Sequence, residues 1–522
     1  YKPNMDYALL KDHSEGVIAS SGCISGYLPR LILDGAPQHE IDECINRHLE
    51  IFGDNYYFEI MPHDLNEQRI VNQHLVKYSL DYGVPLLATN DSHYGKNEDA
   101  STQDVLLMIA TGQSRNQREK KKEAGEEVYE MGEADTLHMM GMDEMAKKFA
   151  KYHYDIPAAV IKKSLLESGK ISDKIEEFEL SKKIKIPKLY DTKEEAKKQL
   201  ESWCREGMER IGKSGVAEYE LRLDYELSVV YDMEVEEYFV LAANLVRWAR
   251  DKGIRISSGR GSAAASLINY LTKVTMLDPI AHKYKFARFL NKNRKGMPDI
   301  DLDFDPERIP EVIEYLEKLL GKDHVCHISA VGTYKPKSAI KDVARVLNVP
   351  FEDVNAVTKV IPDPPNQPPL EILYKEYPEV ADFLDSYPEV KKHAFKIEGM
   401  KKQLSRHAAG ILVSPFPITD EMPIIRGKES MVTGFTDTAG AEWVTGLGWM
   451  KLDILSIDGL TKQGKIIESI YKRTGKRINL DELSVATDPD SADPKVLEIL
   501  ASGRNEGIWQ FRSKGASNFI KG

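Results

Sequence analysis

Cysteine is scarce in this chain of 522 residues, and long apolar runs are lacking. The four cysteines lie far apart and form no CxxC pair, which argues against a disulfide scaffold and indicates a reducing, cytoplasmic compartment. No apolar run approaches the roughly 20 residues that span a membrane. The sequence has no signal peptide. It begins at Tyr1 without an initiator Met and stops at Gly522 without an obvious terminal feature, so we expect a piece of a longer protein at both ends.

An excess of positive charge is also lacking. The formal net charge is −12, which weighs against indiscriminate nucleic-acid binding but leaves room for a local basic groove. Hydrophobic content of 42% and charged content of 30% fit a soluble globular chain, and the length predicts three or four domains. Early in the chain, Tyr56–Ile60 and Val84–Thr89 read as strands around a helix at Glu67–Tyr82. This rhythm predicts an α/β architecture.

An acidic stretch at residues 299–305 dominates the middle of the chain. Four aspartates alternate there with three apolar residues (Asp299, Ile300, Asp301, Leu302, Asp303, Phe304, Asp305). In a strand the carboxylates would share one face and the apolar side chains would pack into a core. Clustered carboxylates favour a bound cation, and Mg²⁺ is the ion that combines carboxylates with substrate phosphates. The alternative is an edge strand whose charges are solvated and prevent aggregation.

A glycine-rich turn precedes this stretch. Ile254–Ser257 reads as a strand, Gly259-Arg260-Gly261-Ser262 as a turn, and Ala263–Leu271 as a helix. Backbone N–H groups of such a turn, helped by the helix dipole, can cradle a phosphate, although a plain turn remains the alternative. A triphosphate turn followed by an Asp-x-Asp strand is the layout of nucleotidyl transfer. The apolar strand Met450–Leu455 offers a third acid, Asp453.

A second candidate metal site lies near the start of the chain. Asp91 and His93 follow the strand at Val84–Thr89, and Cys23 could add a thiolate. The competing reading is a polar turn and a small buried cysteine. Composition alone leaves both readings open.

Together these motifs resemble those of the C-family bacterial replicative DNA polymerases, the DNA polymerase III alpha subunits. Three stretches resemble the palm of that family (Gly259–Ser262, Met297–Phe304 and Lys451–Leu455), supported by His407–Gly410. Two others resemble its PHP (polymerase and histidinol phosphatase) domain (Ser21–Gly26 and Ala88–Tyr94). The resemblance implies a multidomain α/β and α+β chain, divided as follows: 1–175, the C-terminal part of a PHP-type α/β barrel with connecting helices; 176–330 and 409–458, a β-type nucleotidyltransferase palm; 331–408, a helical thumb; 459–522, the start of the fingers.

The resemblance also implies roles for individual residues. Asp299, Asp301 and Asp453 would bind two Mg²⁺ ions, with Asp303 secondary. The triphosphate would be held by the glycine turn (Gly259, Arg260, Gly261 and Ser262). DNA phosphates would meet a basic thumb helix (Lys335, Lys337, Lys341 and Arg345), for which an ordinary solvated face is the alternative. His407 would be structural or lie near the primer strand.

In the PHP part, Cys23, Asp91 and His93 match family metal ligands, implying Zn²⁺ or Mn²⁺ and a 3′–5′ exonuclease in a complete domain. The family's early His-x-His ligands are absent, so this sequence supplies only part of that site. Residues 507–515 resemble the first fingers segment, with Arg512 where an acidic residue is usual.

The function implied is template-directed DNA synthesis in replication, by a DNA-directed DNA polymerase that uses primer–template DNA and deoxynucleoside triphosphates. Sliding clamp and replisome subunits would bind through regions outside this sequence, and we expect this stretch alone to be poorly active. The main alternative is a PHP-type phosphoesterase whose C-terminal part binds nucleic acid. A non-catalytic replisome scaffold and a smaller nucleotidyltransferase with a PHP partner domain are further alternatives, the latter disfavoured by domain order.

Overall fold

The computed structural model describes the chain except for residues 1–4, 127, 129–135, 293–297, 364–366, 428–429, 439–440, 477, 481–490, 504–507, 509–513 and 522. Most of the segment 507–515 therefore lies outside the described residues. The chain divides into two compact units, one of Tyr1–Glu179 with Thr333–Lys402 and one of Leu180–Gly332 with Gln403–Gly522. No helix in the described ranges is long and apolar enough to cross a membrane.

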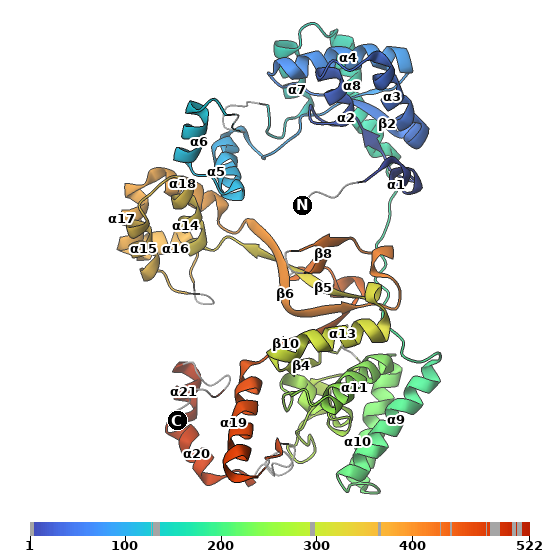
Figure 1. Ribbon diagram of the computed structural model, residues 1–522, viewed down its shortest axis with the longest axis vertical. Helices are drawn as coiled ribbons and strands as arrows, with labels where there is room; N and C mark the ends of the chain where they lie inside the picture. The colour runs from blue at the N-terminus through green and yellow to red at the C-terminus, as the bar shows by residue number, and fades with distance from the viewer. Residues whose placement is uncertain are drawn as a thin grey trace. The chain divides into compact units, whose positions relative to one another are not determined.

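The first unit contains a small parallel sheet, in the order β1 (Ala19–Ser20), β2 (Tyr56–Ile60) and β3 (Leu86–Ala88). The predicted strand at Tyr56–Ile60 is confirmed, and the strand predicted at Val84–Thr89 is shorter. The sheet shares one hydrophobic core with surrounding helices (Figure 1): α2 (Tyr27–Leu33), α3 (Gln38–Phe52), α4 (Asn66–Tyr82), α7 (Met142–Tyr152) and α8 (Ala158–Lys174). Helix α1 (Tyr7–Asp12) begins at the N-cap Asp6, whose carboxylate accepts the Leu9 N–H.

A second core of the first unit is helical. It comprises α5 (Ala100–Thr111), α14 (Pro336–Val346), α15 (Phe351–Val360), α16 (Leu370–Glu376), α17 (Pro378–Ser386) and α18 (Pro388–Ile397). Helix α6 (Arg115–Glu123) follows α5 and is linked to these helices by polar contacts. Val105 and Met108 of α5 pack into this core, and Arg115 forms two hydrogen bonds of 2.9 Å to Glu389. Helices α5 and α6 thus join the helices of the predicted thumb (Figure 1), although sequence reasoning had grouped them with the residues before them.

The second unit is built on a mixed sheet of seven strands. The order is β4 (Asp301–Phe304), β10 (Met450–Ser456), β6 (Lys401–Val413), β5 (Val325–Thr333), β8 (Met431–Thr438) and β7 (Ile424–Arg426), with β9 (Ala441–Glu442) paired to β8. Strand β10 runs parallel to β4 and antiparallel to β6. Strand β10, next to the edge strand β4, therefore has a hydrogen-bonded neighbour on both sides.

Helices cover one face of this sheet. Apolar residues of β4, β6 and β10 share a core with α9 (Lys193–Arg210), α10 (Ala217–Asp232), α11 (Glu236–Asp251), α12 (Leu267–Leu271) and α13 (Ile309–Leu320). A smaller cluster with Trp449 and Leu412 includes side chains from the 3₁₀ turns Ile418–Asp420 and Thr445–Leu447. The unit ends in α19 (Asp458–Thr474), α20 (Pro494–Ala501) and α21 (Lys514–Lys521). Other 3₁₀ turns lie at Gly53–Asn55, Asn97–Asp99, Gly261–Ala265, Phe286–Arg288, Pro306–Arg308 and Lys322–His324.

The predicted strand at Ile254–Ser257 is reduced to a single bridge between Ile256 and Phe304. The Ser257 N–H still donates to the Asp303 carbonyl, so this segment follows β4 without forming a regular strand. Lys185, in the segment between α8 and α9, forms a similar bridge to Trp449. Its buried ammonium donates to the Leu447 carbonyl at 2.9 Å.

Candidate active site

Three aspartates gather where β4 and β10 lie side by side. Asp453 of β10 is in register with Asp301 of β4, and Asp299 precedes Asp301 by two residues. One carboxylate oxygen from each of the three lies within 4.8 Å of the others. Among the residues that the structure describes, this is the one group of three acid, histidine or cysteine side chains that could hold a metal. Acids separated by some 150 positions therefore meet because two strands pair in parallel.

The alternation predicted for the acidic stretch is confirmed on its apolar side. Ile300, Leu302 and Phe304 are at most 1% exposed and belong to the core under the helices. Their burial turns the intervening acids to the opposite face. Asp299 is exposed, Asp301 is partly exposed and Asp453 is 9% exposed. The triad therefore extends from an exposed carboxylate, Asp299, to a nearly buried one, Asp453.

The electrostatics of the triad suit a cation. Burial raises the pKa of Asp301 above its ordinary value, the guanidinium of Arg260 opposes this shift, and the neighbouring acids add to it. A carboxylate whose charged form is disfavoured by burial and by like charges gains most from a divalent ion among the oxygens. The residues present thus fit a divalent metal ion with oxygen ligands.

Two side-chain cations partly neutralise the acids. Arg260 Nη1 lies 2.9 Å from Asp301 Oδ2, and its Nε lies 3.2 Å from both oxygens of Asp303. Lys451 Nζ lies 3.1 Å from Asp453 Oδ1. Sequence reasoning placed Arg260 against phosphate and assigned no role to Lys451, although its position two residues before Asp453 on the same strand puts it on the same face.

The other two aspartates of the stretch have different partners. Asp303 is 1% exposed and accepts a hydrogen bond of 2.9 Å from Ser257 Oγ in addition to the Arg260 contact. Asp305 caps the 3₁₀ turn at Pro306–Arg308 and accepts a hydrogen bond of 2.7 Å from Thr461. Arg260 contacts both Asp301 and Asp303, as the predicted common face requires. Asp303 and Asp305 differ from the exposed Asp299 in being buried among these local partners.

The glycine turn lies beside the triad. Gly261 has φ +65°, and a β-carbon added there would lie 3.7 Å from Asp301 Oδ2. Gly259 has φ +89°, and a β-carbon there would lie 2.6 Å from Thr275 Cγ2. Both positions favour glycine because φ is positive, and Gly259 also because a side chain there would have no space. Ser262 follows on the exposed side of the turn.

The predicted helix after this turn is divided, and its N-terminus is already occupied. Gly261–Ala265 forms a 3₁₀ turn, and α12 begins only at Leu267. The fully buried Glu226 accepts the N–H groups of Leu267 and Ile268 at 2.9 and 3.2 Å. The prediction that the dipole of this helix helps to bind a phosphate is therefore wrong, because the carboxylate of Glu226 already lies where the phosphate would bind. Amides of the turn itself remain the candidate phosphate donors.

The candidate ligands near the start of the chain are only partly gathered. His93 Nε2 lies 3.6 Å from Asp91 Oδ2. Cys23 lies in the turn before α2, and the described residues do not bring it together with the pair into a three-ligand group. Sequence reasoning missed His63, which is 6% exposed and whose pKa burial lowers to about 4, with Asp91 opposing the shift. The metal assignment here stays a prediction.

The basic residues of the predicted thumb lie on or just before α14. Lys335 is its N-cap, and Lys337, Lys341 and Arg345 follow at intervals of four residues, on one side of the helix. Lys341 and Arg345 are exposed, whereas Lys337 is paired with Asp363 at 2.7 Å. Their contact with DNA stays a prediction.

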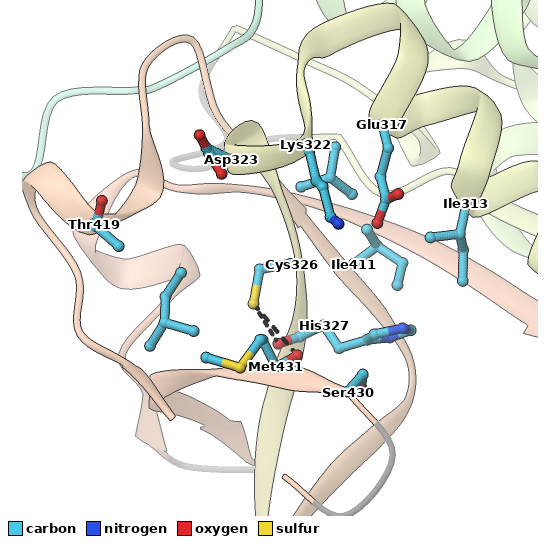
Figure 2. Close-up of a pocket in the computed structure, with 12 residues that line it drawn as sticks. Ile313, Glu317, Lys322, Asp323, Cys326, His327, Ile411, Thr419, Ser430 and Met431 are labelled. Carbon is cyan, nitrogen blue, oxygen red and sulfur yellow. Dashed lines mark hydrogen bonds between the residues drawn. The ribbon is translucent and has the colours of Figure 1, made fainter. Parts of the chain in front are cut away.

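The second unit also contains a cavity of about 540 Å³ apart from the acids. Figure 2 shows its lining, which includes Cys326 and Met431 from neighbouring strands and the charged side chains of Lys322 and Glu317. Burial raises the pKa of the Cys326 thiol to about 11, so the thiol stays protonated at neutral pH. None of the lining residues belongs to the triad.

Carboxylates on two paired strands, beside a glycine turn, are typical of enzymes that use divalent metal ions to transfer phosphate groups. Comparison with known proteins identifies the family. Residues 198–456 match the family model described as the bacterial DNA polymerase III alpha NTPase domain, and residues 1–63 match that of the PHP domain. The chain belongs to the DNA polymerase III alpha family.

Curated relatives agree over the whole chain. The protein named DNA polymerase III subunit alpha of Borreliella burgdorferi is 34% identical over 533 residues, covering 100% of this chain and 43% of the relative. Proteins of the same name from Treponema pallidum and Thermus aquaticus are 32% and 30% identical, covering 43% and 46% of those relatives. The chain thus spans less than half the length of these relatives.

Proposed function

We propose that this chain carries the nucleotidyl-transfer centre of a DNA-directed DNA polymerase acting in replication. The observation that carries the proposal is the register of Asp453 with Asp301, which gathers three acids within 4.8 Å beside the glycine turn. Its substrates would be primer–template DNA and deoxynucleoside triphosphates. The family match supports this assignment over a phosphoesterase, because hydrolysis at a PHP site needs neither the triad nor the turn.

The acidic residues and the glycine turn would have different roles. Asp299, Asp301 and Asp453 would hold two divalent ions, and Mg²⁺ is favoured because every protein ligand is a carboxylate oxygen and substrate phosphates would complete the shell. When bound, such ions supply activation of the primer 3′-hydroxyl and neutralisation of the triphosphate. The chain itself would orient the reactants: the amides of Gly261 and Ser262 would donate to the phosphates, and Arg260 would supply a cation beside them.

The architectural roles follow the same proposal. The mixed sheet of the second unit would be a β-type nucleotidyltransferase palm, helices α14–α18 a thumb whose basic residues meet DNA phosphates, and the first residues part of a PHP barrel holding Zn²⁺ or Mn²⁺. The predicted segment boundaries (175, 330, 408 and 458) belong to this proposal. Clamp and replisome contacts would lie outside this chain.

Single-nucleotide extension tests the proposal directly. The chain is mixed in excess over a labelled primer–template with one deoxynucleoside triphosphate, so that the assay reads chemistry rather than processivity. We expect Mg²⁺-dependent addition of one nucleotide that Asp301→Asn abolishes and that Asp305→Asn retains. Release of nucleotides from the 3′ end without addition would favour the phosphoesterase, and addition that survives Asp301→Asn would refute the assigned centre.

A further inference from the structure

His407 of β6 holds a fixed orientation near the triad. Its Nδ1 accepts the backbone N–H groups of Ala409 and Gly410, at 3.2 and 2.7 Å. A nitrogen that accepts two N–H groups carries no proton, so the neutral ring has its proton on Nε2. Among the described residues Nε2 has no hydrogen-bond partner, and the side chain is half-buried. His407 therefore presents one N–H donor in a set direction.

Gly410 connects this ring with the acids. It is the cross-strand partner of Asp453, so the two residues share a face of the sheet. A β-carbon at Gly410 would lie 3.0 Å from His407 Nδ1 and 3.2 Å from Lys451 Cε. Ile328 Cδ1 would also lie 3.2 Å from that β-carbon. The imidazole and the lysine stem therefore pack closely around the backbone position across from Asp453, and only glycine fits there without displacing them.

The order of the strands assigns a side to each reactant. Across the sheet, Asp301 on β4, Asp453 on β10 and Gly410 on β6 follow one another. Phosphoryl transfer places the attacking and leaving oxygens roughly in line on opposite sides of the phosphorus. The glycine turn next to Asp301 marks the side of the leaving pyrophosphate. The attacking 3′-hydroxyl, and the primer strand behind it, therefore come from the side of β6.

We propose that the Nε2–H of His407 donates to the phosphodiester that joins the last two nucleotides of the primer. This proposal rests on the proposed function and adds a primer-binding residue to it. The donor is neutral and rigid, so it fixes the position of the primer terminus without competing with metal ions for the acids. Lys451, on the other side of Gly410, adds positive charge to the same side.

The test compares two substitutions at His407, which separate the role of Nδ1 as an acceptor from the role of Nε2 as a donor. His407→Asn keeps an acceptor near Nδ1 for the backbone amides and removes the distal donor, whereas His407→Gln places an amide N–H near Nε2. Binding is measured by fluorescence anisotropy at constant salt, with a recessed primer–template and with the same duplex carrying an uncharged methylphosphonate at the last primer linkage. His324→Gln, at a half-buried histidine bonded to the Ser414 carbonyl, is the matched control.

We expect His407→Asn to weaken binding of the natural duplex about tenfold, to leave the methylphosphonate duplex unchanged, and His407→Gln to restore most of the loss. The control should bind both duplexes like the unmodified chain. The proposal is overturned if His407→Asn binds the natural duplex as tightly as the unmodified chain does, or if it loses the same affinity for both duplexes. Either result leaves the proposed function standing as long as the unmodified chain shows Mg²⁺-dependent extension. If the unmodified chain neither extends the primer nor prefers a recessed end over a blunt one, the proposed function fails and this inference with it.

Discussion

Replacing Arg260 with glutamine should tighten the binding of divalent metal in the absence of nucleotide. In the structure Arg260 Nη1 occupies Asp301 Oδ2 at 2.9 Å, so an ion that uses this oxygen must first displace the guanidinium. Both side chains are about one-quarter exposed, at 27% and 23%. The net value of a hydrogen bond between charged groups is about 1.5–3 kcal/mol, and partial exposure favours the lower end.

Removal of this competition is therefore worth about 1.4 kcal/mol, or about a tenfold decrease in the Kd for metal. Mn²⁺ is the probe, because the electron paramagnetic resonance signal of the free ion falls as the ion binds. Arg255→Gln is the matched control: Arg255 lies 3.4 Å from Asp305, outside the triad. A Kd for Arg260→Gln equal to or weaker than that of the unmodified chain would refute the reasoning, provided that thermal melting shows both variants folded.

Three further predictions concern stability and are read by denaturant or thermal unfolding. Glu226→Gln removes a buried carboxylate that accepts the first N–H groups of α12 and pairs with Arg222. We therefore expect the free energy of unfolding to fall by about 2–3 kcal/mol. An unchanged free energy of unfolding would contradict the assigned cap. Gly259→Ala meets both φ +89° and a contact at 2.6 Å, so we expect a loss of about 2 kcal/mol; an unchanged midpoint would show that the turn relaxes freely. Burial lowers the pKa of His393 from 6.5 to about 4, and the unfolded state therefore binds the proton first as pH falls. The helical core of the first unit should lose about 3 kcal/mol between about pH 6.5 and 4, and His393→Gln should flatten this slope; a slope that persists in the variant would exclude His393 as its source.

Local periodicity predicted the elements whose signal lies within a few residues. The alternation of acids with Ile300, Leu302 and Phe304 correctly placed the apolar side in a core, because the period of a strand is two residues. The strand at Tyr56–Ile60 was predicted to the residue. Asp453 was selected by chemistry, since a third carboxylate was needed, rather than by any signal near it.

Contacts between distant segments were not predictable in this way. Nothing in the glycine turn indicates that Glu226, some 40 positions earlier, would cap α12. The packing of α5 on the helices after Tyr334 joins residues more than 200 positions apart, and an amphipathic pattern says which face is apolar without naming its partner. The pairing of Arg260 with acids was missed for a similar reason, because a guanidinium binds carboxylate and phosphate alike.

The most direct measurement is the position of bound metal in crystals of the chain soaked with Mn²⁺ and a deoxynucleoside triphosphate. We expect anomalous density between Asp299, Asp301 and Asp453, with the triphosphate against the Gly261 turn. Full occupancy of Mn²⁺ elsewhere, with no density among these three carboxylates, would contradict the central claim that strand pairing assembles a metal site for nucleotidyl transfer.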